Sequence, residues 1–100
     1  MRNFGTDKPE FMEFTLDGGD KVYKLPLGQS LPFPLRLQYQ EALAETDQMK
    51  QELLLEQFQH DFLAKFMGKK AVESLTMATV QEICQAWLEE SADNGATAGE

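Results

Sequence analysis

The feature that most constrains the fold of this chain is a ridge of large apolar side chains spaced four residues apart. It runs through residues 48–67 and comprises Leu54, Phe58, Phe62 and Phe66. Side chains four apart lie on one face of an α-helix, so the spacing predicts a helix here. Gly68 supplies its end, because glycine accepts the left-handed conformation found after a helix. Further apolar residues stand beside the ridge: Leu55, Leu63 and Met67. The helix therefore needs cover on more than one side.

A β-hairpin is predicted over residues 11–25. Apolar and polar residues alternate before the turn Asp17-Gly18-Gly19-Asp20, and a second apolar segment follows it. Glycines suit the positive φ angles of tight hairpin turns. With the two glycines at the centre of the turn, Phe14 lies opposite Tyr23 and Met12 opposite Leu25 on one face. That face must be covered, because a two-stranded ribbon is marginally stable in water by itself.

Two further helices are predicted on either side of the central one. Prolines fix φ and remove donors, so an extended linker is expected between Pro26 and Pro34. The helix that begins near Pro34 has an apolar stripe formed by Leu35, Tyr39, Ala42 and Leu43. Thr46-Asp47 then ends one helix and caps the next. The last helix begins after Thr76 and has the most regular apolar stripe: Val80, Ile83, Cys84, Trp87 and Leu88.

These elements predict one α+β domain, mostly α, with an N-terminal β-hairpin followed by about three helices. The 100 residues can bury one modest core and leave no room for a second. We expect the domain to span residues 11–90, between a flexible N-terminus over residues 1–10 and a disordered, flexible acidic tail over residues 91–100. The predicted core is formed by residues on the apolar faces: Phe14, Tyr23, Leu43, Phe58, Phe62, Val80, Ile83 and Trp87.

Charge and cysteine content exclude several function classes. Seventeen Asp and Glu against nine Lys and Arg give a net charge of −8 at pH 7, which repels phosphate backbones and anionic lipid headgroups. We therefore expect no nucleic-acid partner and no membrane partner. One cysteine and one histidine cannot form a structural zinc site, and a lone cysteine suits the reducing cytoplasm. The longest aliphatic run, Leu53-Leu54-Leu55, is far shorter than the roughly 20 residues that span a bilayer.

Three candidate chemical sites favour structural interpretations. His60 has Glu56 and Asp61 nearby, but it lies off the apolar ridge and lacks further metal ligands, so a solvated position is favoured. Cys84 stands in the middle of an apolar stripe, which favours core packing over a nucleophile. The segment Asp17-Gly18-Gly19-Asp20 has neither the phosphate-loop nor the calcium-loop pattern and is a turn. We expect no catalytic residue, no metal and no cofactor.

The number of apolar residues on the central helix leaves two interpretations open. Either the hairpin and the flanking helices bury the whole helix, or part of its surface is offered to a partner, because its stripe is wider than the roughly 100° that one core-facing side needs. The second interpretation predicts a partner-binding surface that also includes an aromatic residue of the proline linker: Phe33, Leu55, Phe58, Phe62, Leu63, Phe66 and Met67. We also expect a homo-oligomer, because the hairpin edge and the excess apolar surface need cover.

Four short motifs follow one another over roughly residues 11–90. They are Phe14-Thr15-Leu16-Asp17-Gly18, Val22-Tyr23-Lys24-Leu25-Pro26, Leu75-Thr76 and Ala86-Trp87-Leu88-Glu89. A hairpin ending in Leu-Pro therefore precedes helices, and a Leu-Thr signal introduces a last amphipathic helix with one Trp. This order of parts resembles the tail assembly chaperones of long-tailed (siphovirus-type) bacteriophages.

The resemblance implies a protein without catalytic residues that works in the host bacterial cytoplasm. It implies that the protein coats the long, helix-rich tape measure protein, keeps its apolar stretches from aggregating and helps to recruit tail tube protein. An acidic module with exposed Phe, Met and Leu suits this role, because these side chains pack against varied apolar surfaces while the charge keeps the complex soluble.

Two other classes of protein remain as alternatives. The first is a small acidic phage or bacterial regulatory protein that binds another protein. A mimic of nucleic-acid charge needs carboxylates along one face, whereas here they are spread around helices that also carry Lys50 and Lys65. The second is a small enzyme, which the lack of a plausible catalytic set disfavours.

Overall fold

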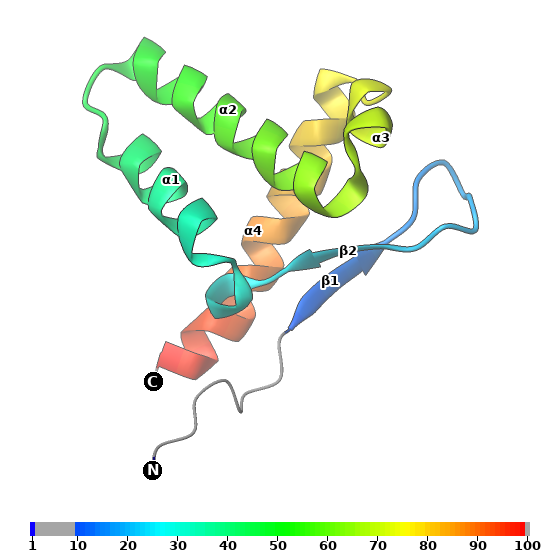
Figure 1. Cartoon of the computed structure of the whole chain (residues 1–100), viewed down its shortest axis with the longest axis horizontal. Coiled ribbons are helices and arrows are strands. Elements are labelled where there is room, and N and C mark those ends of the chain that lie inside the picture. Colours follow the sequence, from blue (N-terminus) through cyan, green and yellow to red (C-terminus); the bar gives the residue numbers. More distant parts are fainter. Residues whose placement is uncertain (2–9, 100) are drawn as a thin grey trace.

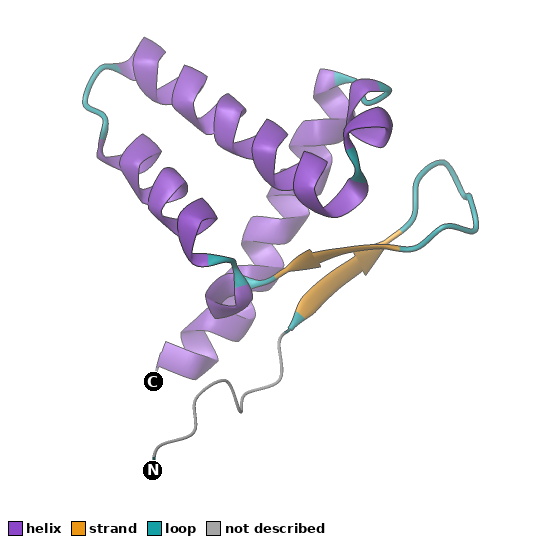
Figure 2. Cartoon of the chain, in the orientation of Figure 1, coloured by secondary structure: helices purple, strands orange, loops and turns teal. Residues whose placement is uncertain are grey.

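A computed structural model describes Met1 and residues 10–99, with side chains described as far as Ala92. About 67% of the chain is helical, and the predicted class, a mostly helical α+β domain with an N-terminal hairpin, is confirmed (Figure 2). The elements in chain order are β1 (Phe11–Phe14), β2 (Tyr23–Pro26), the 3₁₀ turn η1 (Gly28–Ser30), α1 (Phe33–Ala44), α2 (Gln48–Met67), α3 (Lys69–Glu73) and α4 (Met77–Gly99).

The predicted pairing of the hairpin is confirmed, but its turn is centred one residue earlier than predicted. Strands β1 and β2 are antiparallel, with Phe14 opposite Tyr23. The Gly19 amide donates to the Leu16 carbonyl at 2.8 Å, and the two residues between them, Asp17 and Gly18, have φ of 49° and 69°. Aspartate tolerates this left-handed region and glycine adopts it freely, so this pair forms the tight turn.

Helices α1 and α2 form a helical hairpin (Figure 1). Proline stands in the first turn of α1, where its missing N–H costs nothing. The predicted break at Thr46-Asp47 is confirmed, because the Asp47 carboxylate accepts from the Lys50 amide at 3.1 Å and caps α2. The Gln51 side-chain amide donates to the Leu43 carbonyl at 3.1 Å. This bond ties the start of α2 to the end of α1.

A short helix, α3, joins α2 to α4 and was not predicted. Gly68, with φ of 96°, ends α2, and its amide donates to the Ala64 carbonyl at 3.0 Å. The predicted N-cap of the last helix is confirmed, since the Thr79 amide donates to the Thr76 hydroxyl at 3.2 Å. Helix α4 runs behind the end of α2 and behind η1 and extends to Gly99 (Figure 1).

Parts of both predicted flexible ends lie outside the described residues. Residues 2–9 belong to the predicted flexible N-terminus over residues 1–10, which stays a prediction. The predicted acidic tail over residues 91–100 overlaps the end of α4. The side chains of residues 93–100 are not described, so the flexibility of that tail also stays a prediction.

The core is organised around an aromatic cluster where β2, α2 and α4 meet. The Trp87 ring lies against Phe62, with centroids 5.1 Å apart, and Phe58 stacks on Phe62 at 5.5 Å. Tyr39 of α1 joins at 5.0 Å from Phe58. The Trp87 indole N–H donates to the buried Pro26 carbonyl at 2.7 Å. The last helix is therefore tied to the end of the hairpin.

The predicted core is mostly confirmed. Phe58, Phe62, Ile83 and Trp87 are buried, while the partly buried side chains packed against them are Phe14, Tyr23 and Val80. The placement of Leu43 in the core was wrong, because its side chain is 50% exposed. The neighbouring Ala42 takes the inward position, and one residue along a helix turns the side chain by about 100°.

Candidate protein-binding surface

Four of the seven residues predicted to bind a partner are buried in the core, which corrects that prediction. These residues of α2 are Phe58, Phe62, Leu63 and Met67. The aromatic contacts between α2 and Trp87, together with the packing of β2 on α2, cover the ridge within the monomer. This part of α2 is therefore covered within the monomer, whereas Met49 and Leu53 at the start of the helix stay exposed.

The other three predicted residues keep some exposure. Phe33, at the start of α1, is 69% exposed. Leu55 and Phe66 are half-buried, and the Phe66 ring meets the edge of Phe62 at 5.6 Å. Only Phe33 of the predicted set is therefore a freely accessible apolar side chain.

Sequence reasoning missed most of the apolar side chains that are exposed on the helices. They lie on α1, at the start of α2 and on α4: Leu37, Leu43, Met49, Leu53, Met77 and Leu88. One signal was available, because Met49 and Leu53 are spaced four apart and stand off the Phe58–Phe62 ridge. Their exposure depends on which neighbours cover α2, which periodicity does not specify.

A groove of about 340 Å³ lies between η1, α1 and α4, and we call it the α1–α4 groove. Its apolar lining includes Leu31 and Trp87, both buried, and half-buried Tyr39. Leu43 on α1 and Leu88 on α4, which is 42% exposed, also line it. The groove thus presents exposed leucine side chains from α1 and α4 to solvent.

The remaining lining of the α1–α4 groove is polar. Arg36 and Gln40 line it from α1. The Ser91 hydroxyl accepts from the Gly28 amide at 3.2 Å, which fixes η1 against α4. The groove is therefore held by a contact between distant parts of the chain.

A second groove, with a larger volume of about 760 Å³, lies along α4, with Gln59 of α2 on its other side. We call it the α2–α4 groove. Leu88 lines both grooves, so they meet at this residue. Glu82 and Glu89 line the second groove from α4, and the Glu89 carboxylate accepts from the Gln85 side-chain amide at 3.0 Å. The α2–α4 groove is thus acidic as well as open to solvent.

A smaller cavity of about 250 Å³ lies between α2, α3 and α4. Its apolar lining includes Leu63, Val72 and Val80. Glu56 and His60 also line it from α2. This cavity can hold one apolar side chain, but it contributes no ordered set of polar groups.

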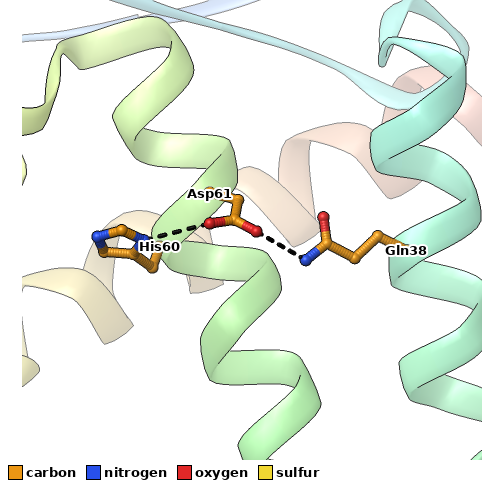
Figure 3. Close-up of polar contacts among 3 residues, drawn as sticks. All are labelled: Gln38, His60 and Asp61. Atoms are coloured by element: carbon orange, nitrogen blue, oxygen red, sulfur yellow. Dashed lines mark hydrogen bonds and ion pairs between the residues drawn. The ribbon is translucent and has the colours of Figure 1, made fainter.

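The polar cluster around Asp61 joins α1 to α2 (Figure 3). The Gln38 side-chain amide donates to one Asp61 carboxylate oxygen at 2.9 Å, and His60 Nδ1 lies 3.3 Å from the other. These hydrogen bonds, chiefly that from Gln38, hold the pKa of Asp61 below its usual value. His60 is more than half exposed, which confirms its interpretation as a solvated position.

Cys84 is buried, which confirms its interpretation as a core residue. Burial raises the pKa of its thiol to about 11, because the thiolate loses hydration. At neutral pH the side chain is the unreactive thiol.

Among the described residues, no group of three or more His, Cys, Asp or Glu could hold a metal ion. None of the described helices is long and apolar enough to cross a membrane.

Comparisons with protein-family models, with curated proteins and with solved structures give no match. The described residues offer two adjoining grooves, one apolar and one acidic, and several exposed apolar side chains on helices. Such features are typical of surfaces that bind other proteins.

Proposed function

We propose that this protein is a non-enzymatic tail assembly chaperone of a long-tailed bacteriophage, which binds and solubilises the tape measure protein in the host cytoplasm. The observation that carries the proposal is the apolar lining of the α1–α4 groove, in which Leu43 and Leu88 are exposed to solvent. Apolar groups gain free energy when they leave water, so a groove of this kind favours an apolar partner.

Two of the four motifs behind the resemblance contact each other, which supports the proposal. Pro26 ends the Leu-Pro segment of the hairpin, and Trp87 belongs to the last helix. The indole of Trp87 donates to the carbonyl of Pro26 across 61 positions of the chain. The Leu-Pro end of the hairpin and the Trp-bearing last helix therefore pack against each other.

The net charge of −8 suits a chaperone of an apolar protein. A complex that retains this charge repels its copies and stays in solution. The exposed apolar side chains outside the two grooves, which include Phe33, Met49 and Leu53, would serve further contacts. We assign to them the contacts with tail tube protein and with other copies of this chain.

A small acidic regulatory protein that binds another protein is the alternative. The carboxylates of Glu82 and Glu89 along the α2–α4 groove favour it, because they suit a basic surface on a regulated target. The two functions differ in the partner that the protein binds. A chaperone binds an apolar client that aggregates by itself, whereas a regulatory protein binds a folded, soluble target.

Co-expression tests the proposal. The tape measure protein encoded in the same genome is expressed alone, with this chain, and with an unrelated acidic protein of similar size. We expect this chain to raise the soluble yield of the tape measure protein several-fold and to co-purify with it. A tape measure protein that stays insoluble with this chain, or that the unrelated acidic protein rescues equally well, would contradict the chaperone function.

A further inference from the structure

We propose that the two grooves along α4 together bind one amphipathic helix of a partner, with an apolar stripe and a flank of lysine or arginine side chains. This inference deepens the proposed function and rests on it, because it specifies which kind of tape measure segment the chaperone binds. The site consists of the α1–α4 and α2–α4 grooves, which we call the α4 face.

The α4 face has the length of a helix-binding site. Its lining residues on α4 extend from Ala78 to Ala92, which corresponds to a rise of about 21 Å. About four turns of a partner helix cover this distance. Ala78, Ala86 and Ala92 are exposed and small, so the backbone of a bound helix can approach α4 closely.

The apolar anchors are concentrated at one end of the α4 face. Leu43 and Leu88 line the α1–α4 groove with exposed side chains, together with Tyr39 and Trp87, whose rings contact each other. A helix that lies in an apolar groove inserts side chains spaced three, four or seven residues apart. This end of the face therefore suits the leucine-type stripe of an amphipathic helix.

The charges along α4 specify the polar flank of the bound helix. Glu82 and Glu89 are two turns apart on the same side of α4, and both line the α2–α4 groove. Among the described residues that line the two grooves, the only cation is Arg36. The net charge of −8 adds a wider negative field. Lysine or arginine side chains beside the stripe are attracted here, and carboxylates are repelled.

The probe for this site is a synthetic peptide of about 18 residues, roughly 27 Å as a helix, with a leucine stripe and lysine flanks. Its twin carries glutamate in place of every lysine. Binding is measured by titration calorimetry and by the fluorescence of Trp87, the single tryptophan of the chain, which lines the α1–α4 groove. We expect the lysine peptide to bind at least tenfold more tightly than the twin, with a difference that shrinks as salt rises.

Matched leucine variants locate the site. Leu43→Ser and Leu88→Ser remove exposed side chains of the α1–α4 groove, whereas Leu53→Ser removes an exposed leucine of α2 that lines neither groove. We expect the two groove variants to weaken lysine-peptide binding at least tenfold and Leu53→Ser to leave it unchanged. All three should melt close to the parent protein, because each leucine is already about half exposed.

A charge variant tests the acidic side of the α4 face. Replacing Glu82 and Glu89 together by Gln should weaken binding of the lysine peptide severalfold and flatten its salt dependence, while Glu13→Gln on the hairpin should do neither. Three results would overturn the inference. The two peptides could bind equally tightly, Leu53→Ser could lose as much affinity for the lysine peptide as Leu43→Ser, or self-association of the chain could displace the peptide.

Co-expression separates this inference from the proposed function. If the Leu43→Ser and Leu88→Ser variants still solubilise the tape measure protein as the parent does, the chaperone function stands, but the α4 face is not its binding site. If the parent solubilises nothing but binds the lysine peptide in the pattern above, the helix-binding site stands and its assignment to a tape measure segment is wrong.

Discussion

Trp87 combines packing in the aromatic core with a buried hydrogen bond. Its ring contacts Tyr39, Phe58 and Phe62, and its N–H satisfies the buried Pro26 carbonyl. A buried carbonyl without a donor loses its hydration without compensation. The side chain thus contributes both packing and a hydrogen bond that joins the last helix to the end of the hairpin.

Substitution of Trp87 separates these two contributions. Trp87→Ala should lower the free energy of unfolding by roughly 3–5 kcal/mol, because it leaves a large cavity. Trp87→Phe keeps an aromatic ring but orphans the Pro26 carbonyl, at a cost of about 1–3 kcal/mol. Denaturant titration measures both, with exposed Met49→Ala as a control expected within about 0.5 kcal/mol of the parent. A transition that Trp87→Ala leaves unmoved would show that the core is assigned wrongly.

Cys84 should make stability depend on alkaline pH. Its pKa is about 11 in the folded protein and 9.0 in its ordinary state, so above pH 9 the unfolded chain releases a proton that the folded chain keeps. Stability is therefore lost as pH rises between these values, by up to about 1.4 kcal/mol per pH unit. Unfolding of the parent and of Cys84→Ala across this range checks the difference. Parallel stability curves for the two proteins, or rapid reaction of native Cys84 with thiol reagents at pH 8, would refute the prediction.

Elements with strong local patterns were predicted well from the sequence. The glycine-containing turn and alternating strands determine the hairpin register, and the apolar spacing determines α2 and α4. Helix α3 was missed because its five residues are too few to show a period. The predicted extended linker contains the 3₁₀ turn η1 instead. Burial of its residues Leu27 and Leu31 was missed because so short a segment has no amphipathic face to recognise.

The candidate site was predicted less well than the fold. Apolar spacing identifies residues that need cover, but it does not distinguish cover within the monomer from cover by a partner. Phe58 and Phe62 are covered by Trp87 from a helix that follows them in the chain, a contact that no local pattern encodes. Leu43 and Leu88 became groove residues through the placement of α1 relative to α4, which the sequence pattern does not specify.

The contact between α1 and α2 through Asp61 should respond to pH and to mutation. Gln38→Ala removes the hydrogen bond that chiefly lowers the Asp61 pKa, so the pKa should rise toward its ordinary value of 3.8. In the parent, the lowered pKa means that this contact stabilises at neutral pH and is lost as pH falls through the Asp61 pKa. Carboxyl NMR titration checks the shift, with Gln40→Ala on the same helix as the control. The cost in stability should stay within about 1 kcal/mol, because the pair is exposed.

The whole molecule carries more exposed apolar side chains than its two grooves use. Phe33, Leu37, Met49 and Leu53 lie outside both grooves, and Phe11 is exposed on β1. We expect these surfaces to support self-association. The charge of −8 on each copy opposes contact, so association should strengthen as salt rises, whereas binding of a lysine peptide weakens. Sedimentation equilibrium that detects only the 11.3 kDa species at all concentrations and salt levels would contradict this expectation.

We propose that the protein binds an apolar helical client through the α4 face. The most direct measurement is NMR chemical-shift mapping of the labelled protein as a soluble helical fragment of the tape measure protein is added. We expect the largest shifts at Leu43, Leu88 and the Trp87 indole, with the hairpin turn at Asp17 and Gly18 unmoved. Shifts confined to the hairpin, or spectra that do not change at all, would contradict it.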